Sequence, residues 1–350
     1  MDVTHRLRMV LATPLEEDLC RLVEQLEPRV ELVRDHDLLP PMRRPGDHGG
    51  DPSFRRPPEQ QAQFETLLDS AEALYGIPDV SPDALARTVA ANPRLRWVQT
   101  MAAGGGAQVA AAGLAAADLE RVTFTTSAGV HAGTLAEFAL FGVLAGAKTL
   151  PRLQAQQRER DWSDRWFMGQ VRDQTVVVVG LGAIGRETAR LLAAVGARVV
   201  GANRSQVAVD GVERTVGLDR LAEVAAEADA LVVTLPGAAA TTGLVDASVL
   251  AALRPGATVV NVGRGTVIDE DALVDALRAG TVGCAVLDVT ATEPLPTDSP
   301  LWDLPNVVIS PHTAALSTAE DRRIAELTAE NARRLLDGEP LRNVVDPADS

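Results

Sequence analysis

The sequence predicts an α/β protein whose larger part is a doubly wound parallel sheet, and three observations support this. Apolar runs of strand length alternate with segments of helical periodicity along most of the 350 residues. Aromatic residues make up only 3% of the chain, so alanine, valine and leucine must fill the interior, as in parallel sheets covered by helices. Residues 176–179 are all valine, which is typical of a strand buried on both faces.

The stretch TVVVVGLGAIGRETARLLAAVGARVVGANRS, residues 175–205, contains the strongest local pattern. After the valines the chain turns through Gly180, Gly182 and Gly185 into an amphipathic helix, which Gly196 ends before a second valine-rich strand. In this setting the first glycine permits a tight turn, the second lets the backbone approach a pyrophosphate, and the third lets helix and strand pack closely. The helix N-terminus offers free N–H groups to phosphates. The pattern therefore predicts a dinucleotide-binding Rossmann domain.

The end of the second strand of this pattern departs from what NAD binding requires. About 20 residues after the glycine turn, where an Asp or Glu would hold the adenosine ribose, the chain has Asn203. Arg204 and Ser205 follow, so a cation and a hydroxyl stand where the 2′-phosphate of NADP would lie. The simpler reading is a solvated polar turn, because arginine is common on surfaces. We expect NADP(H) to be favoured, with NAD(H) possible.

Composition excludes several classes of function. The chain is long enough for two domains, and its 46% of hydrophobic residues can fill a core. A formal net charge of -15 argues against binding to nucleic acid or to acidic membranes, since both need a basic surface. The N-terminal apolar run at residues 9–12 is too short for a signal sequence, and no run approaches the roughly 20 apolar residues of a membrane span. We expect a cytoplasmic protein.

The two cysteines, Cys20 and Cys284, lie far apart in the sequence, each within an apolar run. They form neither a disulfide framework nor a metal-ligand cluster. We expect both thiols to be buried and unreactive, and we expect no metal site.

Regular structure is interrupted in the N-terminal part by residues 35–61, which include the segment LPPMRRPGDHGGDPSFRRPPEQQ. Prolines and glycines there deny regular hydrogen bonding, and four arginines add local positive charge. We predict a long surface loop, either a functional lid or, as the sequence favours, a mobile insertion.

Elsewhere, periodicity and turn residues predict strands and helices that alternate along the chain. The predicted strands are 7–12, 30–33, 73–75, 122–126, 230–235, 258–262, 283–289 and 307–310, and the predicted helices are 16–26, 64–70, 81–91, 134–150, 246–253, 270–279 and 319–336.

Glycines also follow the strand that begins near Arg96, at Ala103, Gly104 and Gly105. Such a turn would let bare backbone N–H groups approach a small anion, although a flexible glycine turn is an equally good reading. Further on, the step Ser127-Ala128-Gly129 is typical of a hinge into the nucleotide domain.

Polar residues follow several strands of the second half, at Pro236, Arg264, Asp288 and His312. In doubly wound sheets ligands bind outside the carboxyl ends of the strands, which is where these residues fall.

A site that transfers hydride to a small keto acid needs a cation that binds the substrate carboxylate (an anion anchor), a proton donor, and a group that adjusts the pKa of that donor. Arg264 lies between two glycines and can grip a carboxylate with both arms of its guanidinium group. His312 follows a proline, and Glu293, in the turn ATEPLP, can hydrogen-bond the second imidazole nitrogen. Taken singly, each has an ordinary reading as a structural or solvated side chain.

Taken together, these residues resemble the D-isomer-specific 2-hydroxyacid dehydrogenases along nearly the whole chain. The matching segments are VVVVGLGAIGR, NVGRGTVIDEDAL (261–273), LDVTATEPLP (287–296) and SPLWDLPNVVISPHTA (299–314). The resemblance implies that Arg264, Glu293 and His312 are catalytic and that Asp288 binds the nicotinamide amide. It also implies that the backbone of Ala103, Gly104 and Gly105 cradles the substrate carboxylate together with Arg264.

The resemblance further implies two domains and a homodimer. A smaller flavodoxin-like substrate domain would comprise residues 1–126 and 317–350, and the dinucleotide-binding domain residues 127–316, through which the family usually dimerises. The residues expected to line the cofactor are Gly180, Gly182, Ala183, Ile184, Gly185, Asn203, Arg204, Ser205, Leu235, Pro236, Thr242, Val262, Gly263, Arg264, Asp288, His312 and Ala314.

The expected function is reduction of a small 2-keto acid to the D-2-hydroxy acid. Because it has Asn203 in place of an acid, the chain resembles the NADPH-using glyoxylate and hydroxypyruvate reductases. The sequence does not identify which keto acid is the substrate. The alternative is a dinucleotide-sensing binding protein, like the transcriptional corepressors that share this fold. Oxidation of formate or phosphite is a third reading, and Glu293 counts against it because formate dehydrogenases resemble this chain but pair the histidine with glutamine.

Overall fold

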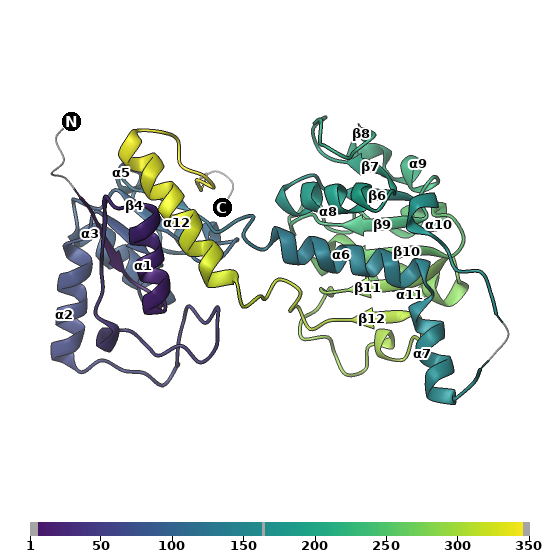
Figure 1. Cartoon of the computed structure of the whole chain (residues 1–350), viewed down its shortest axis with the longest axis horizontal. Helices are drawn as coiled ribbons and strands as arrows, with labels where there is room; N and C mark the ends of the chain where they lie inside the picture. The colour runs from purple at the N-terminus through teal and green to yellow at the C-terminus, as the bar shows by residue number, and fades with distance from the viewer. Residues whose placement is uncertain (1–5, 163–164, 346–350) are drawn as a thin grey trace. The chain divides into compact units, whose positions relative to one another are not determined.

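The computed structural model describes residues 6–162 and 165–345, which divide between two compact units (Figure 1). The smaller unit consists of residues up to Val130 together with those from Leu316 onward, and the larger unit runs from His131 to Ala315. The chain therefore crosses between the units twice.

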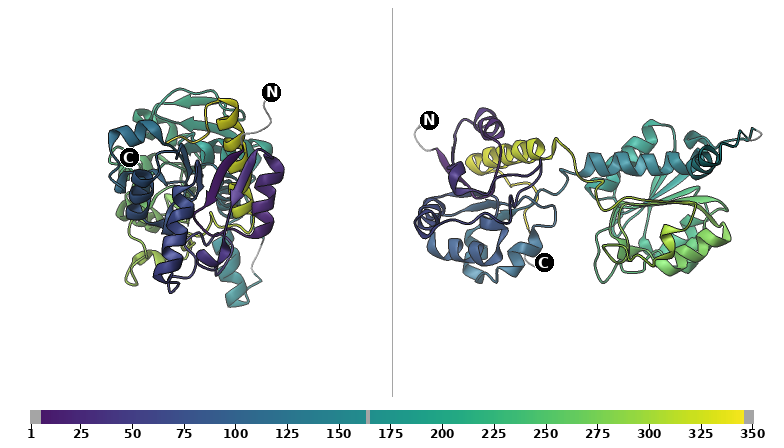
Figure 2. Two further views of the ribbon diagram at one scale, coloured as in Figure 1. Left: turned by 90° about the vertical axis from the view of Figure 1, so that its left-hand side faces the viewer. Right: turned by 90° about the horizontal axis from the view of Figure 1, so that it is seen from below.

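The smaller unit is a parallel sheet of five strands in the order β2-β1-β3-β4-β5, which is the flavodoxin order. Its strands are β1 (Leu7–Leu11), β2 (Val30–Val33), β3 (Ala73–Tyr75), β4 (Trp97–Gln99) and β5 (Thr123–Thr125). Its helices are α1 (Glu17–Leu26), α2 (Pro58–Asp69), α3 (Pro82–Ala91), α4 (Gly106–Ala111), α5 (Ala116–Arg121) and α12 (Glu320–Asp337). Although α1 and α12 are far apart in the sequence, they pack side by side (Figures 1 and 2).

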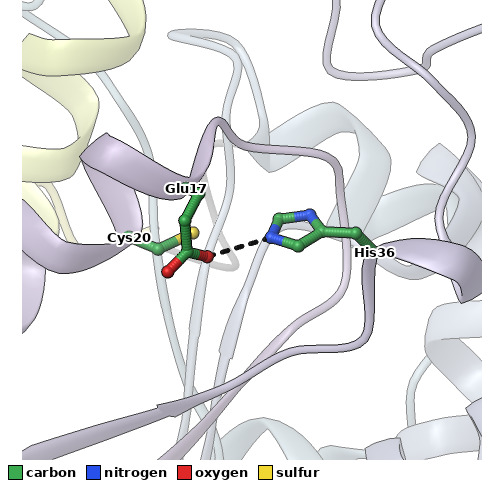
Figure 3. Close-up of side chains that lie close together, drawn as sticks. All are labelled: Glu17, Cys20 and His36. Carbon is green, nitrogen blue, oxygen red and sulfur yellow. Dashed lines mark hydrogen bonds and ion pairs between the residues drawn. The ribbon is translucent and has the colours of Figure 1, made fainter.

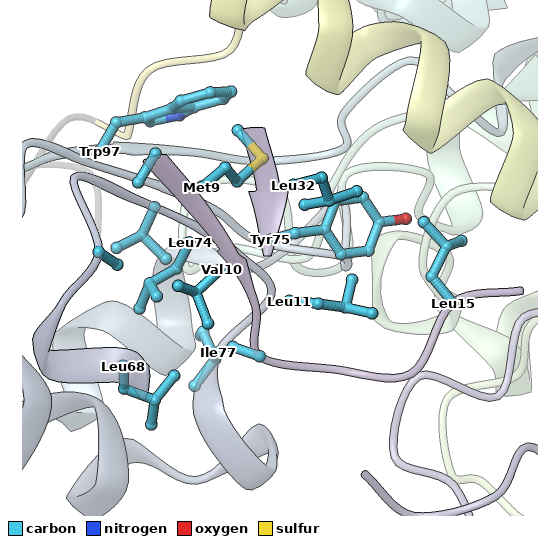
Figure 4. Close-up of a cluster of buried hydrophobic side chains, with 14 of the residues drawn as sticks. Met9, Val10, Leu11, Leu15, Leu32, Leu68, Leu74, Tyr75, Ile77 and Trp97 are labelled. Atoms are coloured by element: carbon cyan, nitrogen blue, oxygen red, sulfur yellow. The ribbon is translucent and has the colours of Figure 1, made fainter. Parts of the chain in front are cut away.

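The core of the smaller unit is filled by aliphatic side chains around two large aromatic residues, Tyr75 and Trp97 (Figure 4). Both aromatic side chains are fully buried. The indole Nε1 of Trp97 donates to Thr125 Oγ1 at 2.8 Å, which satisfies its one polar atom. Helix α12 adds Ile324 and Ala329 to the same core.

The loop predicted at residues 35–61 is irregular, but it is shorter than expected and is packed onto its unit. A 3₁₀ turn forms at His36–Leu38, and α2 already begins at Pro58, because proline is tolerated in the first turn of a helix. The backbone N–H of Gly46 donates to Asp321 Oδ2 on α12 at 2.7 Å. The guanidinium group of Arg56 stacks 3.9 Å from the ring centre of Phe64 in α2. The loop is thus attached to the unit at several points.

The larger unit is a parallel sheet of seven strands in the order β12-β11-β10-β9-β6-β7-β8. Its strands are β6 (Thr175–Val179), β7 (Arg198–Ala202), β8 (Arg214–Val216), β9 (Ala230–Val233), β10 (Ala257–Asn261), β11 (Val282–Leu287) and β12 (Val307–Ile309). Its helices are α6 (Ala132–Ala147), α7 (Leu150–Glu159), α8 (Ala183–Ala194), α9 (Leu221–Ala225), α10 (Ala247–Ala252) and α11 (Glu270–Ala279). From β6 the chain moves to one edge through β7 and β8, then returns to β9 on the other side of β6, so the predicted doubly wound sheet is confirmed.

The valine run lies at the centre of this sheet and is buried on both faces, as expected. Val177 and Val179 pack in the cluster that includes α9, α10 and α11. Val176 and Val178 pack in the opposite cluster, which includes α6 and α8. Helices cover both faces of this sheet (Figure 2). All four valine side chains of the strand therefore contribute to a core.

Several element boundaries differ from those predicted. The helix expected at 134–150 is α6, which ends at Ala147, and a separate helix that was not expected, α7, begins at Leu150. The break falls at Thr149, which adopts a left-handed backbone conformation with φ 51°. Strand β8 and helix α9 have no counterpart among the expected elements, since segments this short carry no clear periodicity. No single described helix is long and apolar enough to cross a membrane, and only the pair α6 and α7, bent by 64°, passes that test of length and composition together.

Helix α6 touches the sheet closely at Gly142, where a Cβ atom would lie 2.7 Å from Val260 Cγ2. We predict that Gly142→Ala destabilises the larger unit, because overpacking costs about 1–3 kcal/mol while the gain in helix propensity is at most about 1 kcal/mol. Urea unfolding followed by circular dichroism measures the difference. Gly133→Ala on the same helix is the control, because its Cβ would meet no atom within 4 Å and should not destabilise. Equal stability of the two variants would contradict this packing.

Candidate active site

The three glycines after β6 each satisfy a separate constraint. Gly180 has φ +97°, which side chains rarely adopt. A Cβ atom on Gly185 would lie 1.8 Å from the Gly180 carbonyl oxygen, so only glycine lets α8 pack against the turn. Around Gly182 no atom lies within 4 Å of a Cβ position, and no side chain caps the N-terminus of α8. The turn therefore leaves open space and unpaired N–H groups where a pyrophosphate would bind.

Asn203, directly after β7, links this strand end to the glycine turn. Its Oδ1 accepts a hydrogen bond from Leu181 N at 3.1 Å, and its Nδ2 donates to Ser205 O at 2.9 Å. Arg204 is exposed and makes no ion pair or hydrogen bond with the residues the structure describes. The strand end thus offers an amide and an unneutralised guanidinium group.

Arg264 follows β10 and lies between two glycines. Neither glycine can be replaced by a larger residue, because each packs against the backbone that follows a neighbouring strand. A Cβ atom on Gly263 would lie 2.4 Å from Leu235 O after β9, and one on Gly265 would lie 1.9 Å from Thr290 O after β11. The Arg264 side chain is exposed, and its Nη1 donates to Gly263 O at 2.8 Å. Close packing on both sides therefore fixes the backbone from which this cation projects.

His312 and Glu293 form a pair at the ends of β12 and β11. Nδ1 of His312 lies 2.7 Å from Glu293 Oε2, and Glu293 Oε1 accepts from Thr290 N at 3.2 Å. His312 has φ +51°, an uncommon conformation for a residue with a side chain, and its N–H donates to Asp288 O at 2.9 Å. Nδ1 is therefore committed to the carboxylate, while Nε2 has no partner in the described chain.

Asp288 is 1% exposed, and its two carboxylate oxygens differ. Oδ1 accepts from Ser310 Oγ at 2.7 Å and from the backbone N–H groups of Thr313 and Ala314 at 3.0 Å. Oδ2 is buried without a partner in the described residues, and an unpaired buried acceptor is costly. A carboxamide N–H₂ is a donor that fits this oxygen, so the residues present are compatible with a nicotinamide.

The structure thus brings Arg264, Asp288, Glu293 and His312 to the carboxyl ends of the adjacent strands β10, β11 and β12. Of the remaining predicted cofactor residues, Ala183 and Ile184 begin α8, Leu235, Pro236 and Thr242 follow β9, Val262 follows β10, and Ala314 follows His312. All of these lie in the larger unit.

The predicted carboxylate cradle lies in the smaller unit, directly after β4. Gly105 is pressed against Thr100, since a Cβ atom there would lie 1.9 Å from Thr100 Oγ1, whereas the Cβ position of Gly104 is open. Ser127 holds the start of this turn, because its Oγ donates to Thr100 O at 2.9 Å and its N–H to Ala102 O at 3.3 Å.

Comparison with known proteins identifies the family. Residues 140–314 match the family model for the D-isomer specific 2-hydroxyacid dehydrogenase, NAD binding domain. The chain belongs to this family. Members of the D-isomer specific 2-hydroxyacid dehydrogenase family are NAD(P)-dependent oxidoreductases that act on a CH–OH group, and the matched residues lie within the larger unit.

Individual relatives agree with this family assignment. A D-isomer specific 2-hydroxyacid dehydrogenase from Xanthobacter autotrophicus Py2, solved with NADPH and MES, has a TM-score of 0.74 at 31% identity, covering 98% of this chain and 99% of that one. Glyoxylate/hydroxypyruvate reductase B from Pectobacterium atrosepticum is 35% identical over 222 residues, 61% of this chain and 68% of that protein. D-3-phosphoglycerate dehydrogenase from Mycobacterium tuberculosis is 38% identical over 255 residues, 73% of this chain but only 47% of that protein.

Two side chains outside the expected set support the site of this family member. Thr234 Oγ1 donates to Gly180 O at 2.8 Å and so steadies the glycine turn. Asn261 accepts from Gly263 N and donates to Arg264 O, both at 3.0 Å, and so fixes the backbone of the candidate anion anchor. The sequence signal for Thr234 is a polar side chain at the end of an apolar run, and Asn261 in addition begins the segment NVGRGTVIDEDAL that carries the family resemblance.

A second cluster of titratable groups lies in the smaller unit and includes one of the two cysteines, which were expected to form no metal-ligand cluster. Glu17, Cys20 and His36 each offer a potential ligand atom, all within 4.8 Å of one another (Figure 3). Hydrogen bonds from Arg34, followed by one from His36, lower the pKa of Glu17 to about 2. Burial raises the pKa of Cys20 to about 12. Glu17 is already bonded to Arg34 and His36, and the Cys20 side chain is fully buried, so we propose no metal ion here.

Both thiols are buried, which agrees with the prediction for Cys20 and Cys284. Burial raises their pKa values to about 12 and about 11, so fewer than about one thiol in a thousand is ionised at pH 8. We predict that neither thiol of the native protein reacts with a disulfide reagent such as DTNB at pH 8, and that both react in guanidinium chloride. Prompt labelling of the native protein would contradict this burial.

Proposed function

We propose that this dehydrogenase reduces a small 2-keto acid, of the glyoxylate or hydroxypyruvate kind, to the D-2-hydroxy acid, with NADPH favoured over NADH. The observation that carries the proposal is the His312–Glu293 pair at 2.7 Å, next along the sheet from Arg264 at the end of β10. Of the sequence relatives described above, one is named a glyoxylate/hydroxypyruvate reductase and the other a D-3-phosphoglycerate dehydrogenase.

His312 is the proposed general acid. With Nδ1 held by Glu293, the ring presents Nε2 to the substrate, and Nε2 gives its proton to the carbonyl oxygen as the carbonyl carbon is reduced. The carboxylate of Glu293 stabilises the protonated ring before transfer and fixes its tautomer afterwards. When bound, the reduced nicotinamide supplies the hydride, and Asp288 Oδ2 would hold its carboxamide.

Arg264 is the proposed anion anchor. Its guanidinium group binds the substrate carboxylate. The turn from Ala103 to Gly105, in the smaller unit, is proposed to offer backbone N–H groups to a substrate anion. The smaller unit thereby acts as the substrate domain and the larger one as the nucleotide domain. A cytoplasmic location and the absence of nucleic-acid partners remain predictions from the sequence.

His312→Ala tests the chemistry. We expect turnover of glyoxylate or hydroxypyruvate to fall about 10²–10⁴-fold with little change in the dissociation constant of NADPH, because general acids contribute about that much to rate. Glu293→Gln keeps a side chain able to accept a hydrogen bond but removes the charge, so its loss should be smaller.

His36→Ala is the matched control for this experiment, since His36 also pairs with a glutamate, Glu17, at 3.1 Å. It should retain wild-type turnover. Equal losses in the two histidine variants would contradict the assignment of His312. Wild-type protein that binds the dinucleotide but reduces no keto acid would instead support the alternative of a dinucleotide-sensing binding protein.

Arg204 tests the cofactor preference. A charge-assisted bond to the 2′-phosphate contributes roughly 1.5–3 kcal/mol, so we expect kcat/KM to favour NADPH at least about tenfold. Arg204→Ala should weaken use of NADPH much more than use of NADH. Asn203→Asp preserves the acceptor for Leu181 N, adds a negative charge and should shift preference toward NADH. A wild-type preference for NADH at fixed salt would refute this part of the proposal.

We also propose that the protein forms a homodimer through the larger unit. Exposed apolar side chains gather on and after α6 and α7, with Phe141 and Leu153 about two-fifths exposed and Trp162 and Phe167 fully exposed. Isolated chains rarely leave such aromatic surface in water. We expect light scattering to give a dimer mass for wild type and a monomer mass for Trp162→Asp combined with Phe167→Asp. A monomeric wild type would contradict this interface.

A further inference from the structure

Arg186 lies in the first turns of α8, directly after the third glycine of the turn. Its Nε donates to the carbonyl oxygen of Leu181 at 2.9 Å. The N–H group of the same Leu181 donates to Asn203 Oδ1 at 3.1 Å. Arg186 and Asn203 therefore bond to the two backbone polar groups of the same residue, Leu181. Arg204 is the residue next to Asn203 in the chain.

The charge of Arg186 is not neutralised within the described chain. Its one hydrogen bond is to a neutral carbonyl oxygen, and the side chain is exposed. Arg190, one turn further along α8, is different, because its guanidinium group pairs with Glu187 at 2.6 and 2.9 Å. In a chain with a formal net charge of -15, Arg186 and Arg204 are two exposed arginines without a carboxylate partner in the described residues, and each is one bond or one residue away from the Leu181–Asn203 link.

We propose that Arg186 is a second cation for the 2′-phosphate of NADPH, acting together with Arg204. This inference rests on the proposed use of NADPH. Because Nε is bound to the Leu181 carbonyl, the guanidinium group is oriented and its two Nη groups remain as donors. A phosphate monoester presents three acceptor oxygens, which is enough for two guanidinium groups and the hydroxyl of Ser205. Arg186 therefore contributes to discrimination between the two cofactors without contacting the nicotinamide.

The test measures binding of adenosine 2′,5′-bisphosphate and of 5′-AMP by calorimetry at low, fixed salt. These ligands differ only in the 2′-phosphate and need no turnover. Arg186→Gln should weaken the bisphosphate about fivefold or more, since each exposed charge-assisted contact contributes modestly, and should leave 5′-AMP within about twofold. Arg190→Gln is the matched control and should change neither affinity.

The outcomes separate this inference from the proposal on which it rests. If Arg186→Gln and Arg204→Ala both lose selectivity for the bisphosphate, the result supports the proposal that both arginines bind the 2′-phosphate. Loss in Arg204→Ala alone overturns the role of Arg186 while the NADPH preference stands. Equal weakening of both ligands in Arg186→Gln also overturns it, because Arg186 would then act on the glycine turn. Wild type without selectivity for the bisphosphate overturns both.

Discussion

Backbone segments in the larger unit lie so close together that only glycine fits at three positions around the candidate site, one where α8 meets the glycine turn and two between adjacent strand ends. A Cβ atom on Gly185, Gly263 or Gly265 would lie between 1.8 and 2.4 Å from a carbonyl oxygen of a neighbouring segment. Each of these glycines costs conformational entropy on folding. In return the backbone beside the functional side chains has little freedom, and Arg264 projects from a rigid support rather than from a mobile loop.

One buried acid, Asp288, fixes the backbone around His312. Asp288 is buried, and Oδ1 gathers three donors from the segment after β12, while its own carbonyl oxygen accepts from His312 N. These bonds hold His312 in a left-handed conformation that a histidine seldom adopts. Glu293 then meets the ring from the next strand end. The geometry of the proposed proton donor is therefore set by backbone contacts of its neighbours.

Much of this arrangement follows from the sequence, because parallel strands place their carboxyl ends along one edge. The alternation of elements and the glycine turn predict the larger sheet, and polar residues after its strands predict which side chains meet. The left-handed backbone of His312 and the roles of Thr234 and Asn261 could not be predicted, since they depend on contacts between segments far apart in the chain. The pairing of Glu17 with His36 is missed for the same reason.

Helix α12 packs beside α1 in the smaller unit, adds Ile324 and Ala329 to its core, and bonds through Asn331 to Gln99 Oε1 on β4. The whole larger unit, His131–Ala315, lies between these partners in the chain. During synthesis from the N-terminus, the larger unit can acquire all its strands while the smaller sheet still exposes the surface that α12 covers. The unit whose strands leave the ribosome first is therefore completed last.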